Sequence, residues 1–387
     1  MKNKTSAVKT ANPFISFYGA HGISPVHQDV RNFKVHLMRR EKLYRMLGLP
    51  VVAFNQRTIL EIGPGGGYNA LAFFAWGARV DFIEPNPKAQ EELPQLLGKH
   101  HIKRDKWSLF PGKIEDFQSD RLYDIVIAEG FIPGLYDREK VINKISRLVK
   151  KGGVVVVTCV DDISFFFEIT KRIIGHRLLN AFKVENFSQK IALLSRAFST
   201  HFKSLKYTSR PLKDWIADTY LNPGIYGKFF SIADCISEFD KDFIMLGSSP
   251  AMFTDCSWYK NIEFDREGSL LKQFFVKRHI LMLWDMEEST RTIGANKLLC
   301  SQIYDLRQYA GRIEARMDAG HVAGIIEKLK RIKCSISDID GRARKAIDEA
   351  VVLLQDKKID AAKIANAGML ASAFGRGQQY VSLSRKT

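Results

Sequence analysis

The sequence predicts an α/β fold built on a doubly wound sheet, and two observations carry this prediction. A short apolar strand over 59–62 runs into a glycine loop over 63–67, and a helical stretch over 69–76 and a second strand over 79–83 follow. Further along, the run over 153–160 is continuously apolar, as expected of a parallel strand that helices cover on both faces. Strands that alternate with helices in this way predict parallel strand–helix–strand units.

The residues of the glycine loop narrow the ligand that it would bind. Residues 61–68 read Glu-Ile-Gly-Pro-Gly-Gly-Gly-Tyr, and the strand over 79–83 is followed by Glu84. Tyr68 stands where a dinucleotide-binding fingerprint needs its third glycine, and the Gly-Lys-Ser/Thr end of a phosphate-binding Walker loop is absent. Glu61 would face a pyrophosphate unfavourably, but it suits a ligand that carries a cationic ammonium group.

The remaining core elements follow from the apolar pattern. The final segment alternates in the way that an edge strand does, and we interpret it as an antiparallel seventh strand. In chain order we expect a helix over 87–97, strands over 107–110 and 123–128, a helix over 141–149, the strand over 153–160, a helix over 231–239, a strand over 243–247 and the last strand over 378–385.

The pattern Glu-x-Gly-x-Gly-x-Gly, with an acid about twenty residues further on, resembles motif I of the class I S-adenosylmethionine (SAM) methyltransferases. The resemblance covers 58–160 and implies a Rossmann-like core of seven strands, methyltransferase activity and SAM as cofactor. It implies that the glycines approach the methionine part of SAM, that Glu61 orients its methionine end, and that Glu84 takes the ribose hydroxyls. The residues that it assigns to the cofactor are Glu61, Gly63, Pro64, Gly65, Gly67, Asn69, Glu84, Pro85, Ile114 and Glu115; Lys113 replaces the acid that usually contacts the adenine.

The N-terminal part is expected to form a lid. An amphipathic helix starts at Val30 and is ended by Gly48 and Pro50, and a loop with His21 and His27 precedes it. In the family that the core resembles, such a segment often folds over the SAM pocket. The order that we expect is an N-terminal lid segment (1–57), a SAM-binding core (58–160), an insertion forming a substrate cap (161–230), a core helix and sixth strand (231–254), a helical insertion (255–375) and the last core strand (376–387).

A hydroxyl acceptor needs a base, and three residues are candidates for this catalytic role. Glu129 follows the fourth strand, where related enzymes place substrate-facing residues, and His21 and His27 follow as candidates. The alternatives are an acid that caps a helix or lies beside SAM, and histidines that are hydrogen-bonded within their loop. Asp161 and Asp162 lack an evident third ligand, so we predict no metal site. Four aromatic residues could line a sugar site or belong to the core: Tyr18, Trp215, Trp258 and Tyr259.

The acceptor is the least determined part of the prediction. The loop after the fourth strand reads Ala-Glu-Gly-Phe over 128–131, and this lacks the Asn/Asp-Pro-Pro-aromatic run of enzymes that methylate amines of nucleic-acid bases. This loop and the short runs over 21–25 and 375–380 resemble bacterial methyltransferases associated with surface glycan biosynthesis, which implies O-methylation of a sugar. The net charge of +17 admits an anionic partner: a nucleotide-sugar, a phosphorylated lipid carrier, RNA or a membrane surface. Two alternatives stay open, an RNA methyltransferase and a non-catalytic SAM-binding scaffold.

Composition indicates the compartment. The five cysteines form no C-x-x-C pair, the N-terminus lacks the apolar core of a signal peptide, and no apolar run is long enough to span a bilayer. We therefore expect a cytoplasmic protein.

Apolar stripes such as Ile325, Leu329 and Ile332 are expected to pack in a core, with a homodimer surface as the alternative.

Overall fold

The structure is a computed structural model that describes residues 13–135, 137–239, 241–262 and 265–387. The chain divides into two compact units. The first unit comprises 1–160, 227–273 and 378–387, and the second comprises 161–226 and 274–377. The two segments of the second unit overlap the two predicted insertions. No helix among the described residues is long and apolar enough to cross a membrane.

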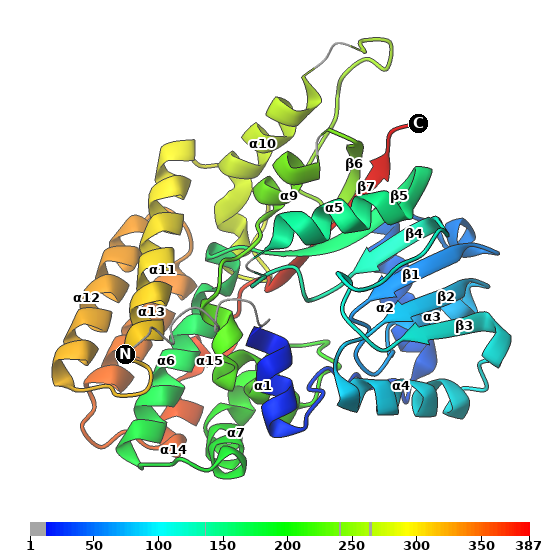
Figure 1. Ribbon diagram of the computed structural model, residues 1–387. Helices are drawn as coiled ribbons and strands as arrows, with labels where there is room; N and C mark the ends of the chain where they lie inside the picture. Colours follow the sequence, from blue (N-terminus) through cyan, green and yellow to red (C-terminus); the bar gives the residue numbers. More distant parts are fainter. Residues whose placement is uncertain (1–12, 136, 240, 263–264) are drawn as a thin grey trace, which may run out of the picture. The chain divides into compact units, whose positions relative to one another are not determined.

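A seven-stranded sheet forms the centre of the first unit and confirms the predicted fold class (Figure 1). The strand order is β3-β2-β1-β4-β5-β7-β6; β1 to β5 are parallel, and β7 runs antiparallel to both of its neighbours. The final segment of the chain therefore enters the sheet between β5 and β6, and it is an inner strand instead of the predicted edge strand. The strands are β1 (Thr58–Ile62), β2 (Arg79–Ile83), β3 (Trp107–Phe110), β4 (Tyr123–Ala128), β5 (Val149–Val160), β6 (Phe243–Ser249) and β7 (Gln378–Arg385).

The start of β5 differs from the prediction. The sequence places a helix up to Val149 and a strand from Gly153, whereas the strand begins at Val149 and passes through both glycines. Gly152 has a φ of +72°, and a Cβ on Gly153 would lie 2.9 Å from the carbonyl oxygen of Asp124. The two glycines therefore absorb the irregularity at which the β4–β5 register shifts.

Helices cover the sheet in the order that the sequence predicts. Helix α5 packs on β4 and β5, α9 on β5, β6 and β7, and α3 on β2. The helices of this unit are α1 (Pro13–His21), α2 (Phe33–Met46), α3 (Ala70–Ala75), α4 (Pro87–Lys99), α5 (Arg138–Leu148) and α9 (Ile232–Phe239), with single 3₁₀ turns at Val51–Phe54 and Arg104–Lys106. Helix α10 (Arg266–Lys277) begins in the first unit and ends in the second.

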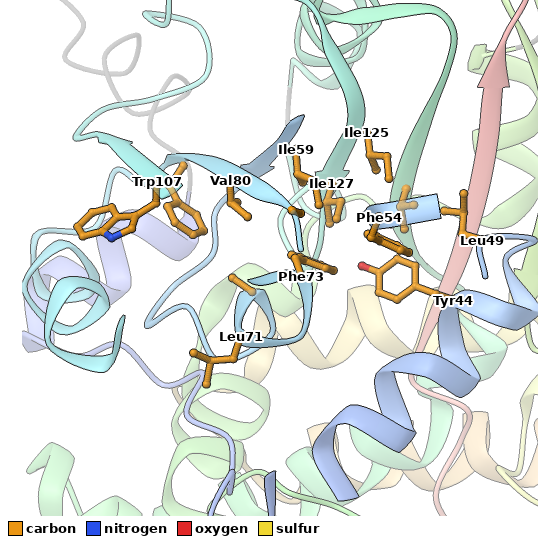
Figure 2. Packing of buried hydrophobic residues seen from close by; sticks show 14 of the residues in the cluster. Tyr44, Leu49, Phe54, Ile59, Leu71, Phe73, Val80, Trp107, Ile125 and Ile127 are labelled. Carbon is orange, nitrogen blue, oxygen red and sulfur yellow. The ribbon is translucent and has the colours of Figure 1, made fainter. Parts of the chain in front are cut away.

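An aromatic cluster joins α2 and α3 to the sheet (Figure 2). Tyr44 meets Phe54 edge-on with 4.9 Å between ring centroids, and Phe54 stacks on Phe73 at 5.7 Å. All three side chains are buried, and aromatic pairs of this kind add about 0.5–1.5 kcal/mol each beyond the burial of their area. The cluster fixes α2 against the sheet and so sets the position of Arg40, one turn before Tyr44.

The second unit is helical. Its elements are a 3₁₀ turn (Ile163–Phe165), α6 (Phe166–Ala181), α7 (Phe187–Ser204), α8 (Leu212–Trp215), a π-helix (Ile216–Leu221), 3₁₀ turns at Pro223–Tyr226 and Arg278–Leu281, α11 (Ile293–Ile313), α12 (Ala319–Ser335), α13 (Gly341–Gln355), α14 (Ala361–Ala365) and α15 (Gly368–Ser372). Ile325, Leu329 and Ile332 are fully buried, which confirms that this stripe packs in a core. The buried Arg172 pairs with Glu314 at 2.6 Å and links α6 to the end of α11.

Candidate active site

The glycine loop between β1 and α3 turns through left-handed backbone. Gly63, Gly65 and Gly67 have φ angles of +70°, +55° and +80°, a region that disfavours residues with a Cβ. The Gly63 N–H donates to the carbonyl oxygen of Ile83 at 2.8 Å, so the loop starts against the end of β2. The loop therefore presents bare backbone at the carboxyl ends of β1 and β2, where ligands bind in open α/β sheets.

Glu84 is the first residue after β2, and it contacts the glycine loop. Its carboxylate accepts hydrogen bonds from the backbone N–H groups of Gly65 and Asn86, both at 2.8 Å. Burial raises the pKa of Glu84 to about 7, although these two hydrogen bonds favour its charged form. The acid expected to hold a ribose is thus fixed in place by the backbone of Gly65 and Asn86.

Glu61 lies in β1 and is almost completely buried. One of its carboxyl oxygens, Oε2, has no hydrogen-bond partner among the described residues. Burial raises the pKa of Glu61 to about 8; the nearby Glu129 adds to the rise, and Arg40 opposes it. Because an unpaired buried polar atom costs about 1–3 kcal/mol, this oxygen marks a place where a donor or a cation would be stabilised.

Glu129 sits at the centre of a buried polar network. Its Oε1 accepts from Arg40 Nη2 at 2.5 Å and from the Tyr44 hydroxyl at 3.2 Å. Its Oε2 accepts from Arg40 Nη1 at 3.2 Å and from Asn69 Nδ2 at 2.9 Å. Four donors therefore engage the carboxylate, which ties α2, the end of β4 and the glycine loop together. Asn69, predicted to contact the cofactor, is held by Glu129.

The segment 23–27, which we call the strap, lies on the glycine loop. The carbonyl oxygen of Ile23 accepts from Asn86 Nδ2 at 3.0 Å. A Cβ on Gly65 would lie 2.3 Å from Val26 Cγ2, so the strap approaches the loop as closely as a glycine permits. His27 Nε2 lies 3.5 Å from a carboxyl oxygen of Glu92. The strap thus covers the loop at the position where the sequence predicts a lid.

The other predicted site residues are spread more widely. His21 lies at the exposed end of α1, with its ring 4.7 Å from that of Phe17. Ile114 is buried, whereas Glu115 is exposed, so only Ile114 of the predicted adenine pair is enclosed by the fold. Pro64 lies within the glycine loop and Pro85 follows Glu84, and both are partly buried.

Sequence reasoning missed the polar stripe of α2. The residues His36, Arg40 and Tyr44 recur every four positions and are the buried residues of this helix. The sequence predicted an amphipathic helix with Tyr44 on its apolar face, and it did not predict that His36 and Arg40 are buried. Burial and the neighbouring Arg40 lower the pKa of His36 to about 4, so its imidazole is neutral at pH 7. The spacing of four between His36, Arg40 and Tyr44 places them on one helical face and was the signal in the sequence, but it does not reveal that this face lies against Glu129.

Contacts and exposure bear on two other interpretations, that of Asp161 and Asp162 and that of Trp258 and Tyr259. Asp161 pairs with Arg278 at 2.7 Å and Asp162 with Arg307 at 2.8 Å, so guanidinium groups neutralise both acids. The side chains of Trp258 and Tyr259 are 66% and 82% exposed. The alternative that these two aromatic residues belong to the core is therefore wrong.

Comparison with known proteins identifies the domain around the glycine loop. A family model described as a methyltransferase domain matches residues 60–157, from β1 to β5. The chain carries a class I SAM-dependent methyltransferase domain. The match begins at the strand that contains Glu61 and includes the glycine loop, Glu84 and Glu129.

Curated relatives match the same region over part of their length. Ribosomal RNA small subunit methyltransferase A of Bifidobacterium adolescentis is 26% identical over 114 residues, which cover 27% of this chain and 36% of the relative. The same protein of Bifidobacterium longum is 28% identical over the same shares. The chain thus spans little more than a third of the length of these relatives.

Solved structures of methyltransferases resemble the chain at low similarity. A putative sarcosine dimethylglycine methyltransferase from Galdieria sulphuraria is 12% identical, with a TM-score of 0.38 over 90% of this chain and 86% of that one. The N-methyltransferase NodS from Bradyrhizobium japonicum is 19% identical, with a TM-score of 0.32 over 39% of this chain and 75% of that one. Similarity at this level gives no information on the acceptor.

Proposed function

We propose that the chain transfers a methyl group from SAM to a hydroxyl group of a small molecule or glycan, with a sugar as the favoured acceptor. The proposal that SAM is the cofactor rests on three groups at the ends of β1 and β2. These are the unpaired oxygen of the buried Glu61, the bare backbone of Gly63 to Gly67, and Glu84. They fit a cationic amino acid joined to a ribose.

Each group has a distinct task in this proposal. SAM, when bound, supplies an electrophilic methyl carbon on a sulfonium. Glu61 ionises and pairs with the ammonium of the methionine part, the glycine loop approaches it through backbone, and Glu84 accepts from the ribose hydroxyls. Ile114 provides apolar contact for the adenine. Since the cofactor carries the reactive carbon, the protein's main contribution is to position the acceptor oxygen and remove its proton.

We propose that Glu129 is a positioning residue. Four donors already engage its two oxygens, so a substrate proton would have to compete with Arg40, Tyr44 and Asn69 for the same lone pairs. Its buried pairing instead holds Asn69, and through it the end of the glycine loop, in one arrangement.

His27 is the better candidate for the base. It lies in the strap on the glycine loop, and the Glu92 carboxylate, 3.5 Å from its Nε2, would stabilise the imidazolium that forms when it takes a proton. His21, at the exposed end of α1, is the second candidate.

The experiment separates binding from catalysis. We expect the chain to bind S-adenosylhomocysteine in a calorimetric titration and to transfer labelled methyl from SAM to at least one of a panel of nucleotide-sugars. His27→Gln should lower turnover while leaving the affinity for S-adenosylhomocysteine within about twofold, and Glu129→Gln should weaken that affinity. Binding without transfer to any acceptor in a cell lysate would favour the scaffold alternative. Full turnover in His27→Gln would remove His27 as the base.

RNA is the second candidate acceptor. The net charge of +17 and the partial match to ribosomal RNA methyltransferases favour it, whereas the loop over 128–131 argues against an exocyclic base amine as target. The salt dependence of binding to mixed-sequence RNA distinguishes the two. A protein that neutralises several phosphates loses affinity steeply between low and moderate salt. Methyl transfer to RNA with such a dependence would replace the sugar proposal.

A further inference from the structure

The loop between β6 and α10 exposes an apolar tip. Trp258, Tyr259 and Ile262 are 66%, 82% and 93% exposed, and they are three of the five most exposed large apolar side chains among the described residues. All three fall within five consecutive positions. In Figure 1 this loop, drawn in yellow-green, extends beyond the ends of β6 and α10 at the top of the view. We call these three residues the aromatic tip.

The base of the loop is anchored, although its tip is exposed. The side-chain amide of Gln273 in α10 bonds both backbone groups of Thr254: its oxygen accepts from the N–H at 2.8 Å, and its nitrogen donates to the carbonyl oxygen at 3.0 Å. Arg266 pairs with Asp255 at 3.1 Å and donates to the Met245 carbonyl oxygen of β6 at 3.1 Å. The loop is therefore held to β6 and α10 by side-chain contacts at its base.

The chemistry of the tip matches a lipid–water interface. Trp and Tyr join an apolar ring to a polar N–H or O–H group, and they gather at the headgroup level of bilayers. The Lys260 ammonium lies 5.2 Å from the Trp258 ring centroid and 5.7 Å from that of Tyr259, so a cation stands beside both rings. Ile262 adds an aliphatic side chain. Aromatic rings, a lysine and an aliphatic residue on one projecting loop suit shallow insertion among lipid headgroups.

The charge of the whole chain selects the kind of surface. The net charge of +17 attracts the chain as a whole to an anionic surface. At the tip itself, Lys260 is the one charged residue over 256–262, and the preceding acid, Asp255, is paired with Arg266. A protein partner would need more than the tip, because a stable protein interface uses about 800 Å² and 20–30 residues on each side. We propose that the aromatic tip docks the chain on anionic lipid bilayers by inserting Trp258, Tyr259 and Ile262 at the interface.

Co-sedimentation of the full chain with vesicles tests this proposal. Vesicles of roughly one part phosphatidylglycerol to three parts phosphatidylcholine are compared with pure phosphatidylcholine. We expect binding to the anionic vesicles, and a loss of at least about tenfold in partitioning for W258S/Y259S, because partitioning scales with the apolar area that is buried. The matched control is Y207S/V352S, which removes two comparably exposed side chains from the second unit and should partition within about twofold of the wild type.

Further readouts separate docking from misfolding and from protein contacts. W258S/Y259S should keep the wild-type thermal unfolding midpoint and the wild-type affinity for S-adenosylhomocysteine. Brominated lipids should quench part of the tryptophan fluorescence in the wild type and less in this variant. The proposal is overturned if the wild-type chain does not bind anionic vesicles, or if W258S/Y259S binds them as the wild type does. A change of oligomeric state in lipid-free sedimentation velocity, with partitioning unchanged, would make the tip a protein contact and would equally overturn it.

Discussion

Substitution of Glu61 by Gln tests whether a buried, protonated acid receives the cationic cofactor. With a pKa raised to about 8, Glu61 holds about 0.9 of a proton at pH 7 in the free chain. An opposite charge within contact distance lowers a carboxyl pKa by about 1–3 units. Binding of SAM at pH 7 should therefore release about 0.4 to 0.9 of a proton from this residue. Glu61→Gln has no such proton to release.

Calorimetry measures this release directly. Titrations with SAM in buffers of different ionisation enthalpy give the number of protons as the slope of observed enthalpy against buffer enthalpy. Glu84, whose pKa is raised to about 7, can also exchange protons, so the difference between wild type and Glu61→Gln isolates Glu61. We expect Glu61→Gln to show the smaller release and weaker binding at pH 7, and the difference in release to shrink by pH 9. Equal slopes for the two proteins at pH 7 would refute the role assigned to Glu61.

Three further predictions concern the free chain and its glycine loop. Because burial raises the pKa of Glu61 from 4.5 to about 8, wild-type stability should fall as pH rises through that window, by about 3 kcal/mol at pH 7. Glu61→Gln should therefore melt at a higher temperature than the wild type at pH 8 and lose this advantage below pH 4.5. The same difference in melting temperature at both pH values would contradict the burial cost. Arg40→Met leaves the Glu129 carboxylate buried without its counter-charge and should lower the free energy of unfolding in urea by about 3–5 kcal/mol. Adding Glu129→Met should restore most of this loss, and an unchanged urea midpoint in Arg40→Met would show that the pair contributes nothing. Gly65→Ala places a Cβ 2.3 Å from Val26 of the strap at a φ of +55° and should weaken S-adenosylhomocysteine binding at least about tenfold. The control Gly98→Ala, at a helical site where the new Cβ meets no atom within 4 Å, should bind as the wild type does. Equal affinities of the two variants would mean that the loop tolerates a side chain.

The sheet and the glycine loop were predictable because their signals are local. The unit from Thr58 to Glu84 carries its strand pattern, its glycines and its acids within one short stretch. The last strand was also predictable from alternation, but its place inside the sheet depends on pairing with β5 and β6, which are distant in the sequence.

The network around Glu129 was not predictable, because its partners are distant in the sequence. Arg40 and Glu129 are 89 positions apart, and nothing in the α2 sequence distinguishes an arginine that faces a buried acid from one that faces water. The same holds for Val26, whose side chain lies where a Cβ on Gly65 would stand. The exposure of Trp258 and Tyr259 was likewise missed, since an aromatic residue is more often buried than presented at a loop tip.

In the proposed function, Glu84 and the glycine loop hold the nucleoside part of SAM. Calorimetric titration with S-adenosylhomocysteine, of the wild type and of a Glu84→Ala variant shown to fold by its thermal transition, tests it most directly. We predict saturable binding at one site in the wild type and loss of that binding in Glu84→Ala. No binding to the wild type, or equal affinity in both proteins, would contradict the account.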